Sequence, residues 1–161
     1  MTLSLGGVTV GLAILVYVSV RWFQRSRGRW LVLAPFLLSA AYGMLLILST
    51  GGILGGAADV ALWGSNVVGD SALEYGVGGG TPEVTRTHTL ALTDGGHAMV
   101  LVITAGMAAY WQFGKKAPKR DMALGALCGV SLGLASGVAG WAADFLAPVV
   151  NSGGDSIMGV L

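Results

Sequence analysis

Apolar residues fall in four long blocks along the chain, separated by short polar segments. The blocks cover residues 3–20, 31–54, 97–113 and 122–149. A helix rises about 1.5 Å per residue and the hydrocarbon core of a bilayer is about 30 Å thick, so each block approaches the length of a membrane-spanning helix. The pattern predicts an all-α integral membrane protein with four transmembrane helices in one domain over residues 1–161.

The composition agrees with a membrane protein. Hydrophobic residues make up 54% of the chain and charged residues 11%, whereas a soluble domain carries about 25% charged residues. Disorder requires low hydrophobicity and collagen requires glycine at every third position, so both classes are excluded. The single cysteine, Cys128, excludes an intrachain disulfide and a cysteine metal cluster, and its apolar surroundings predict core packing.

The basic residues are concentrated in two short turns, one between the first and second blocks and one between the third and fourth. They are Arg21, Arg25, Arg27, Arg29, Lys115, Lys116, Lys119 and Arg120. Among the acidic residues, only Asp121 lies beside these turns. Short basic loops stay in the cytoplasm. We therefore expect both turns to lie inside, and both termini and the loop over residues 55–96 to lie outside.

Aromatic residues support this orientation. Trp22 and Trp30 flank the first basic turn, and Tyr110 and Trp111 precede the second, as is typical of residues at a membrane interface. A cleaved signal peptide has basic residues before its apolar stretch, whereas the arginines here follow residues 3–20. We expect the first helix to be retained in a multi-pass protein of the bacterial cytoplasmic membrane.

The outer loop divides at the glycine run over residues 76–80. Its first half has the period of a helix, with Asp59, Asn66 and Asp70 in one polar stripe and Glu74 close by. This stripe either binds a cationic partner or is the solvated face of an interfacial helix, and we favour the second. Residues 84–93 alternate in polarity, which predicts a short strand whose edge could form a subunit contact.

Candidate metal ligands lie near the outer end of the third block. His88, Asp94 and His97 carry the imidazole and carboxylate groups that bind zinc. A helix cap at Thr93 or Asp94, together with an interfacial histidine, explains the same residues, and we favour it. No cofactor is predicted. The chain also lacks paired carboxylates within a span, a serine elbow, a phosphate loop and a haem motif, which argues against an enzyme.

Asp144 is the one acidic residue near the end of a predicted span. It lies about 33 Å along a helix that starts at Met122, which places it at the outer membrane boundary. A tilted helix would instead make Asp144 an intramembrane acid and a candidate ion or proton site. We favour the boundary position.

Glycine spacing is the most informative pattern in the chain. Glycines recur every four residues in the fourth block, at Gly125, Gly129, Gly133 and Gly137. Pairs elsewhere have the same spacing: Gly7 with Gly11, Gly51 with Gly55, and Gly52 with Gly56. Small residues allow helix backbones to approach closely in lipid. The groove they form could hold the first or second helix of the same chain, or a neighbouring copy. We favour the copy, and hence a homo-oligomer.

Each half of the chain is a predicted helical hairpin with both ends outside, a basic cytoplasmic turn and a glycine-rich second arm. In topology and composition this resembles the pilin-type and spread-type small membrane proteins of bacterial conjugative elements. Such pilins usually have one hairpin and lose an N-terminal leader, whereas this chain has two hairpins and a first helix that we expect to be retained. The resemblance transfers no functional residue.

Three functions are compatible with these features. We favour a non-enzymatic, self-associating structural subunit of a transfer, secretion or envelope assembly, with lipids, other copies and other membrane or envelope subunits as partners. The alternatives are a pore of the holin or small-transporter type, for which the spans offer only mildly polar serines and threonines, and a metal-dependent membrane factor that uses the outer histidines. The basic turns are expected to contact anionic lipid headgroups, and nucleic acid is disfavoured because no folded basic domain is present.

Overall fold

The computed structural model is all-helical, as the sequence predicts. It describes residues 3–26, 29–49, 52–80, 82–83, 92–114, 118–135 and 141–160. These residues form α1 (Leu5–Ser26), α2 (Trp30–Leu48), α3 (Gly52–Gly76), α4 (Asp94–Phe113), α5 (Lys119–Gly133) and α6 (Trp141–Met158). Within the described ranges no strand is present, although Ser4 and Glu83 form an isolated antiparallel bridge.

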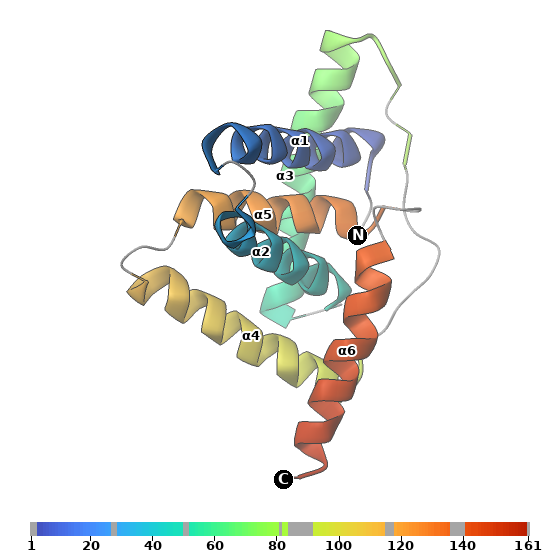
Figure 1. Cartoon of the computed structure of the whole chain (residues 1–161). Coiled ribbons are helices and arrows are strands. Elements are labelled where there is room, and N and C mark those ends of the chain that lie inside the picture. The colour runs from blue at the N-terminus through green and yellow to red at the C-terminus, as the bar shows by residue number, and fades with distance from the viewer. Residues whose placement is uncertain are drawn as a thin grey trace.

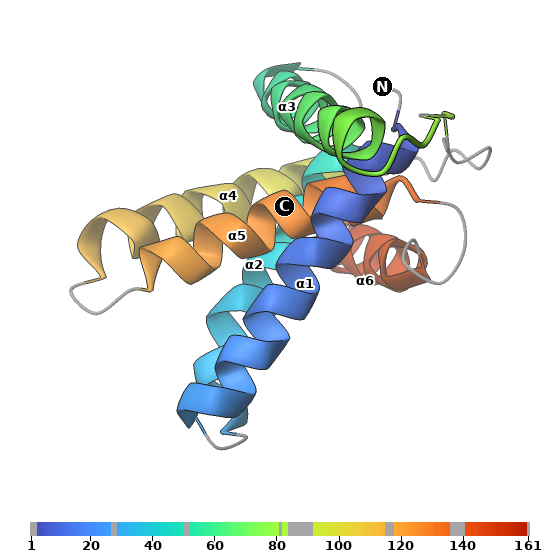
Figure 2. The same ribbon diagram turned by 90° about the horizontal axis from the view of Figure 1, so that it is seen from above.

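The helices form two hairpins that are crossed by two further helices. In Figure 1, α1 and α4 end, and α2 and α5 begin, on the same side of the molecule. Helices α3 and α6 run steeply across the hairpins near the opposite side, and Figure 2 shows them on two different sides of α2 and α5. Helices α2 and α5 form the centre, where Phe36, Leu45, Ile47, Cys128 and Leu132 are buried.

Two of the predicted spans have the wrong extent. The span over residues 31–54 is wrong beyond Leu48, where α2 ends. Helix α3 then begins at Gly52, whose φ of 66° is one that glycine adopts readily and other residues rarely do. The span over residues 122–149 is wrong as a single helix, because α5 ends at Gly133 and α6 begins at Trp141 and runs in another direction. Continuous hydrophobicity therefore did not mean a continuous helix.

The outer loop contains the helix that was predicted there. Helix α3 covers the predicted amphipathic segment and ends at Gly76, at the start of the glycine run. The predicted strand over residues 84–93 falls almost entirely on residues outside the described ranges. Its last residue, Thr93, has an extended backbone and caps α4, since its side chain accepts a hydrogen bond from the backbone N–H of Gly96. This confirms the predicted helix start.

The two halves of the chain are copies of one three-helix unit. One motif occurs twice, at residues 57–71 in α3 and 85 positions later at residues 142–156 in α6. It consists of Ala-Ala-Asp, any six residues, Asn, any two residues and Gly-Asp-Ser. A second motif lies at the starts of α1 and α4, at Ser4 and at Thr93. It consists of Ser or Thr, any residue and Gly-Gly. Helices α1, α2 and α3 therefore correspond to α4, α5 and α6.

The contact between the halves has the reciprocity of a two-fold axis. A Cβ on Gly43 of α2 would overlap the carbonyl of Ala126 in α5, and a Cβ on Gly129 of α5 would overlap the carbonyl of Ala40 in α2. Both pairs place a glycine against an alanine three positions earlier in the equivalent helix. Because α2 and α5 run in the same direction, the pseudo-two-fold axis lies along the hairpins, between these two helices.

Two helices in the described part of the chain are long and apolar enough to be candidate membrane spans. These are α1, over Leu5–Arg25, and α2, over Trp30–Leu48. Only 22% of the first span and 33% of the second are buried inside the protein, and both helices carry large exposed apolar side chains, such as Val16 in α1 and Leu38 in α2.

Candidate functional site

The most distinctive polar structure in the described residues is a pair of equivalent junctions at the starts of α1 and α4. In the first, the backbone N–H of Ser4 donates to Oδ1 of Asn66 at 3.2 Å, and the N–H of Gly7 donates to the Ser4 hydroxyl at 3.1 Å. A Cβ on Gly69 would overlap the carbonyl of Gly6. The first turn of α1 thus lies directly on the backbone of α3.

The second junction repeats these contacts between α4 and α6. The backbone N–H of Thr93 donates to Oδ1 of Asn151 at 3.1 Å, and the N–H of Gly96 donates to the Thr93 hydroxyl at 3.0 Å. A Cβ on Gly154 would overlap the carbonyl of Gly95. The Thr93 hydroxyl also donates to Oδ1 of Asp155 at 2.9 Å.

The junctions place a carboxylate beside the N-terminus of a helix in both halves. Asp70 lies against Gly6 of α1, and Asp155 lies against Gly95 of α4. The positive end of the helix dipole stabilises such a carboxylate. One oxygen of Asp70 is buried without a hydrogen-bond partner, whereas the equivalent oxygen of Asp155 accepts from Thr93. The arrangement fixes each crossing helix to its hairpin.

The sequence interpretation of α3 as a solvated acidic stripe is wrong for Asn66 and Asp70. Asp59 and Glu74 are exposed, but Asn66 and Asp70 are only partly exposed and face α1. The signal that would have found the junctions is the internal repeat, because two polar motifs that recur in the same order, 85 and 89 positions apart, indicate two copies of one structure.

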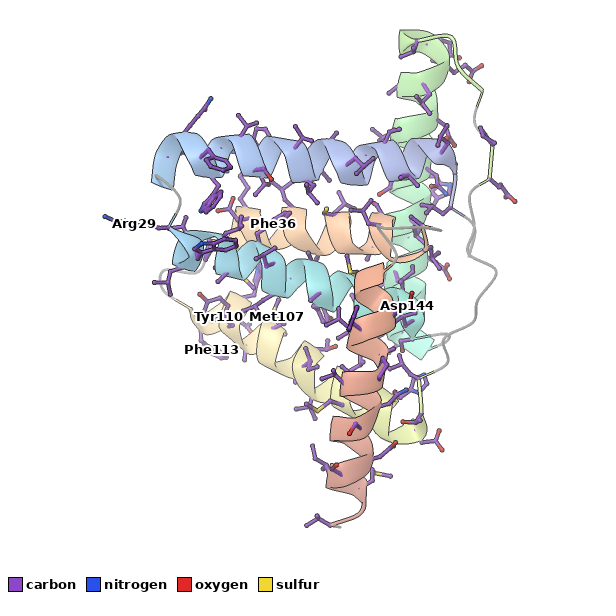
Figure 3. All side chains as sticks on the ribbon, turned by 45° about the vertical axis from the view of Figure 1, so that its right-hand side comes forward. Arg29, Phe36, Met107, Tyr110, Phe113 and Asp144 are labelled. Carbon is purple, nitrogen blue, oxygen red and sulfur yellow. The ribbon has the colours of Figure 1, made fainter. Side chains whose placement is uncertain are left out.

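The basic turns lie at the other end of the hairpins. Arg29, just before α2, and Phe113, at the end of α4, lie on the same side of Figure 3. Arg21 of α1 forms an ion pair with Asp121 of α5 at 3.1 Å, which links the two halves. Nε1 of Trp22 donates to the Arg29 carbonyl at 2.8 Å and so ties the end of α1 to the start of α2. Arg27, Lys115 and Lys116 lie outside the described residues.

The glycines of the fourth block face α2 of the same chain. Gly125 lies against Phe36 and Ser39, Gly129 against Ala40, and Gly133 against Met44 and Ile47. This part of the groove, which we expected a neighbouring copy to fill, is thus occupied within the chain. Gly137 lies outside the described residues.

The other predicted packing glycines divide in the same way. Gly7 contacts Asn66 of α3 and Gly11 contacts Leu132 of α5, so both face helices of the same chain. Gly55 is buried within α3, Gly52 and Gly56 have open space around them, and Gly51 is outside the described residues. Cys128 is buried and donates to the Gly11 carbonyl at 3.3 Å, in agreement with its predicted place in the core.

The candidate metal ligands are not brought together in the described part of the chain. No group of three or more His, Cys, Asp or Glu residues that could hold a metal is found there. Nδ1 of His97 lies 2.9 Å from the Thr93 carbonyl, Asp94 is exposed in the first turn of α4, and His88 is outside the described ranges. The predicted position of Asp144, at the far end of a long span, is wrong, because Asp144 lies in the first turn of α6 (Figure 3).

These contacts can hold helices together and present charge at one end of the hairpins. No family model matches the sequence, and comparison with curated proteins and with solved structures gives no significant match.

Proposed function

We propose that the chain is a non-enzymatic integral membrane protein that serves as a structural subunit of a membrane assembly. In this proposal α1, α2, α4 and α5 cross the bilayer, and α3 and α6 lie along its outer surface. The observation that carries the proposal is the apolar side surface of the hairpins. Large exposed apolar side chains there include Val16, Val20, Phe23, Leu31, Leu38, Leu101, Val102 and Phe113.

The lengths of the hairpin helices are compatible with a membrane. Helices α1 and α4 contain 22 and 20 residues, enough for about 30 Å of hydrocarbon. Helix α5 has only 15 residues, or about 22 Å, but it lies between α1 and α2 and is largely buried. A short central helix meets little lipid, so its mismatch with the bilayer costs little.

The crossing helices have the properties of surface helices. Helix α3 exposes both apolar side chains, at Val60, Trp63 and Val68, and charged ones, at Asp59 and Glu74. An interfacial helix places its apolar face among the acyl chains and its charges in water. The basic turns at the far end of the hairpins then lie in the cytoplasm, as positive charge in short loops favours.

A structural role has more support than a pore through one chain. The central helices α2 and α5 touch backbone to backbone at Gly43 and Gly129. Three buried serines are also hydrogen-bonded: Ser39 donates to the carbonyls of Pro35 and Phe36, and Ser131 donates to Ser65. Conduction needs polar groups that line an open path. The described core offers instead a packed centre.

Impermeant maleimide labelling of single cysteines tests the membrane arrangement. In a Cys128→Ser background, Ser71→Cys in α3 should react on intact cells, and Ser26→Cys at the end of α1 should react only after permeabilisation. Labelling of position 26 alone on intact cells would reverse the orientation. Extraction of the protein from membranes by alkaline carbonate would reject the membrane proposal altogether.

The mass of the purified protein in mild detergent tests self-association separately. The proposal predicts a complex larger than one chain of 16.4 kDa. Because α2 covers Gly125, Gly129 and Gly133, copies would meet through the exposed side surface rather than through that groove. A single-chain mass would remove self-association and leave the membrane arrangement standing. The resemblance to proteins of conjugative elements stays a prediction.

A further inference from the structure

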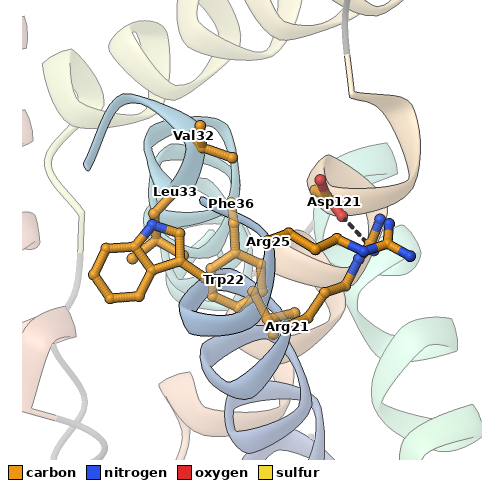
Figure 4. Close-up of a pocket in the computed structure, with 8 residues that line it drawn as sticks. Arg21, Trp22, Arg25, Val32, Leu33, Phe36 and Asp121 are labelled. Atoms are coloured by element: carbon orange, nitrogen blue, oxygen red, sulfur yellow. Dashed lines mark hydrogen bonds and ion pairs between the residues drawn. The ribbon is translucent and has the colours of Figure 1, made fainter. Parts of the chain in front are cut away.

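A pocket at the basic end of the first hairpin combines apolar walls with two arginines. It lies between α1 and α2, beside the start of α5, and has a volume of about 80 Å³ (Figure 4). Val18, Leu33 and Phe36 provide apolar walls together with Trp22, and Arg21, Arg25 and Asp121 provide the charges. The hydrogen bond from Trp22 to the Arg29 carbonyl holds the indole in place.

The charges at this pocket do not balance. Arg21 is paired with Asp121 at 3.1 Å, and no ion pair of Arg25 is found among the described residues. In Figure 4 the side chains of both arginines extend in the direction of Asp121. Two guanidinium groups and one carboxylate leave a net charge of about +1 beside an apolar wall, which suits an anion attached to an apolar group.

The second half of the chain provides an internal comparison. By the repeat, Val18, Trp22 and Phe36 correspond to Met107, Trp111 and Met122, and these three line a cavity of about 260 Å³ that α4 and α5 form with α2. Arg21 and Arg25 correspond to Tyr110 and Gly114. The second hairpin therefore keeps large apolar side chains at three positions of the pocket and has neither arginine.

We propose that the pocket of the first hairpin binds one anionic phospholipid. Its phosphate pairs with Arg25 and with the outer face of the Arg21 guanidinium, and its acyl chain follows the apolar wall at Val32 and Leu33. Arginine forms forked hydrogen bonds with phosphate oxygens, and basic pockets between helices on the cytoplasmic side are suited to anionic headgroups. This proposal rests on the membrane arrangement proposed above.

Native mass spectrometry with added phosphatidylglycerol tests the site. The wild-type chain should retain one phosphatidylglycerol in preference to phosphatidylcholine. Arg25→Gln should weaken this retention about fivefold, the contribution of one arginine beside an anionic headgroup. Arg120→Gln is the matched control, because Arg120 is exposed at the same end of the protein and does not line the pocket.

A variant of the second hairpin tests whether the two arginines are enough to create a second lipid site. The double variant Tyr110→Arg with Gly114→Arg places arginines at the positions equivalent to Arg21 and Arg25, and it should retain a second phosphatidylglycerol. Gly114 has a φ of −69°, which a side chain tolerates. Failure of this variant to bind a second lipid would contradict the recognition of lipid by the two arginines.

Three other results would overturn the proposal. Equal losses in Arg25→Gln and Arg120→Gln would mean a general basic surface, and equal retention of phosphatidylcholine would mean an apolar groove without anion recognition. Retention of soluble glycerol phosphate as strongly as of the lipid would identify a soluble anion as the ligand. Carbonate extraction of the same variants tests the membrane arrangement independently. A protein that stays in the membrane but shows no lipid selectivity would contradict the lipid site and leave the membrane arrangement standing.

Discussion

Single glycines determine how closely the helices of this protein approach. At Gly69 and Gly154 a crossing helix lies on the first turn of a hairpin helix, and a Cβ would overlap the facing carbonyl. At Gly64 and Gly153 a Cβ would meet nothing within 4 Å. Glycine costs a helix up to about 1 kcal/mol relative to alanine. Close backbone contact offsets this cost at Gly69 and Gly154, but not at Gly64 and Gly153.

Alanine substitutions at neighbouring glycines of α6 should therefore have opposite effects. Gly153→Ala should raise the free energy of unfolding by up to about 1 kcal/mol through helix propensity. Gly154→Ala should lower it by about 1–3 kcal/mol, because the methyl group forces α4 away from α6. Thermal unfolding in one detergent measures both. Similar shifts for the two variants would contradict the close contact of Gly154 with Gly95.

The same comparison in the first half tests the equivalence of the junctions. Gly69→Ala should weaken the packing of α3 on α1 and lower the free energy of unfolding, as Gly154→Ala does for α6 on α4. Gly64→Ala is the control, because a Cβ on Gly64 would meet nothing within 4 Å. A destabilised Gly154→Ala with an unaffected Gly69→Ala would mean that the two halves do not share this junction in solution.

At the scale of helices, α2 and α5 form the pair on which the fold depends. Their contact runs from Phe36 beside Gly125 to Ile47 beside Gly133, along most of both helices. It joins the two halves, and the ion pair between Arg21 and Asp121 adds a second link near the basic end. A partly exposed ion pair between two helices contributes about 1 kcal/mol, so the close packing of α2 on α5 dominates.

Leucine at Gly129 distinguishes packing within the chain from packing between chains. Gly129→Leu should lower the unfolding temperature at unchanged particle size, because its side chain would displace Ala40 of α2 in the same chain. Gly106→Leu in α4 is the control, since that glycine is exposed and has open space around it. A smaller particle for Gly129→Leu alone would restore the interpretation of this row as a subunit interface.

The sequence predicted the hairpins better than their connections. Apolar length was enough to place α1, α2 and α4 as helices, apart from the end of α2. The break after Gly133 was not predicted, because residues 134–140 are as apolar as a span and hydrophobicity carries no information on direction. The end of α2 was missed for the same reason, since Gly52 differs from its neighbours in backbone φ and not in polarity.

The polar junctions could not be predicted from either half of the chain alone. Asn66 and Asp70 have the helical spacing of a solvated stripe, and nothing local distinguishes that from a contact with α1. Only their repetition at Asn151 and Asp155 indicates a shared structure. Gly125, Gly129 and Gly133 pack against α2, but the spacing of the glycines alone does not identify the helix that fills the groove.

At the scale of the whole molecule, the chain is a pseudo-symmetric pair of three-helix units. Each unit makes its own junction between a hairpin helix and a crossing helix, at Ser4 with Asn66 and at Thr93 with Asn151. The units then meet mainly through α2 and α5. If the proposed bilayer arrangement holds, the pseudo-two-fold axis lies along the membrane normal, so both basic turns must be on one side and both crossing helices on the other.

Cleavage between the units tests this organisation. A protease site inserted after Glu83 divides the chain between α3 and α4, so each fragment keeps its own junction. The two fragments should stay together in mild detergent after cleavage, because the contact of α2 with α5 does not depend on the connecting segment. The cleaved Gly129→Leu variant should separate into two fragments, whereas the cleaved Gly106→Leu variant should not. Separation of the cleaved wild-type protein would show that the connection, and not the pairing of α2 with α5, holds the units together.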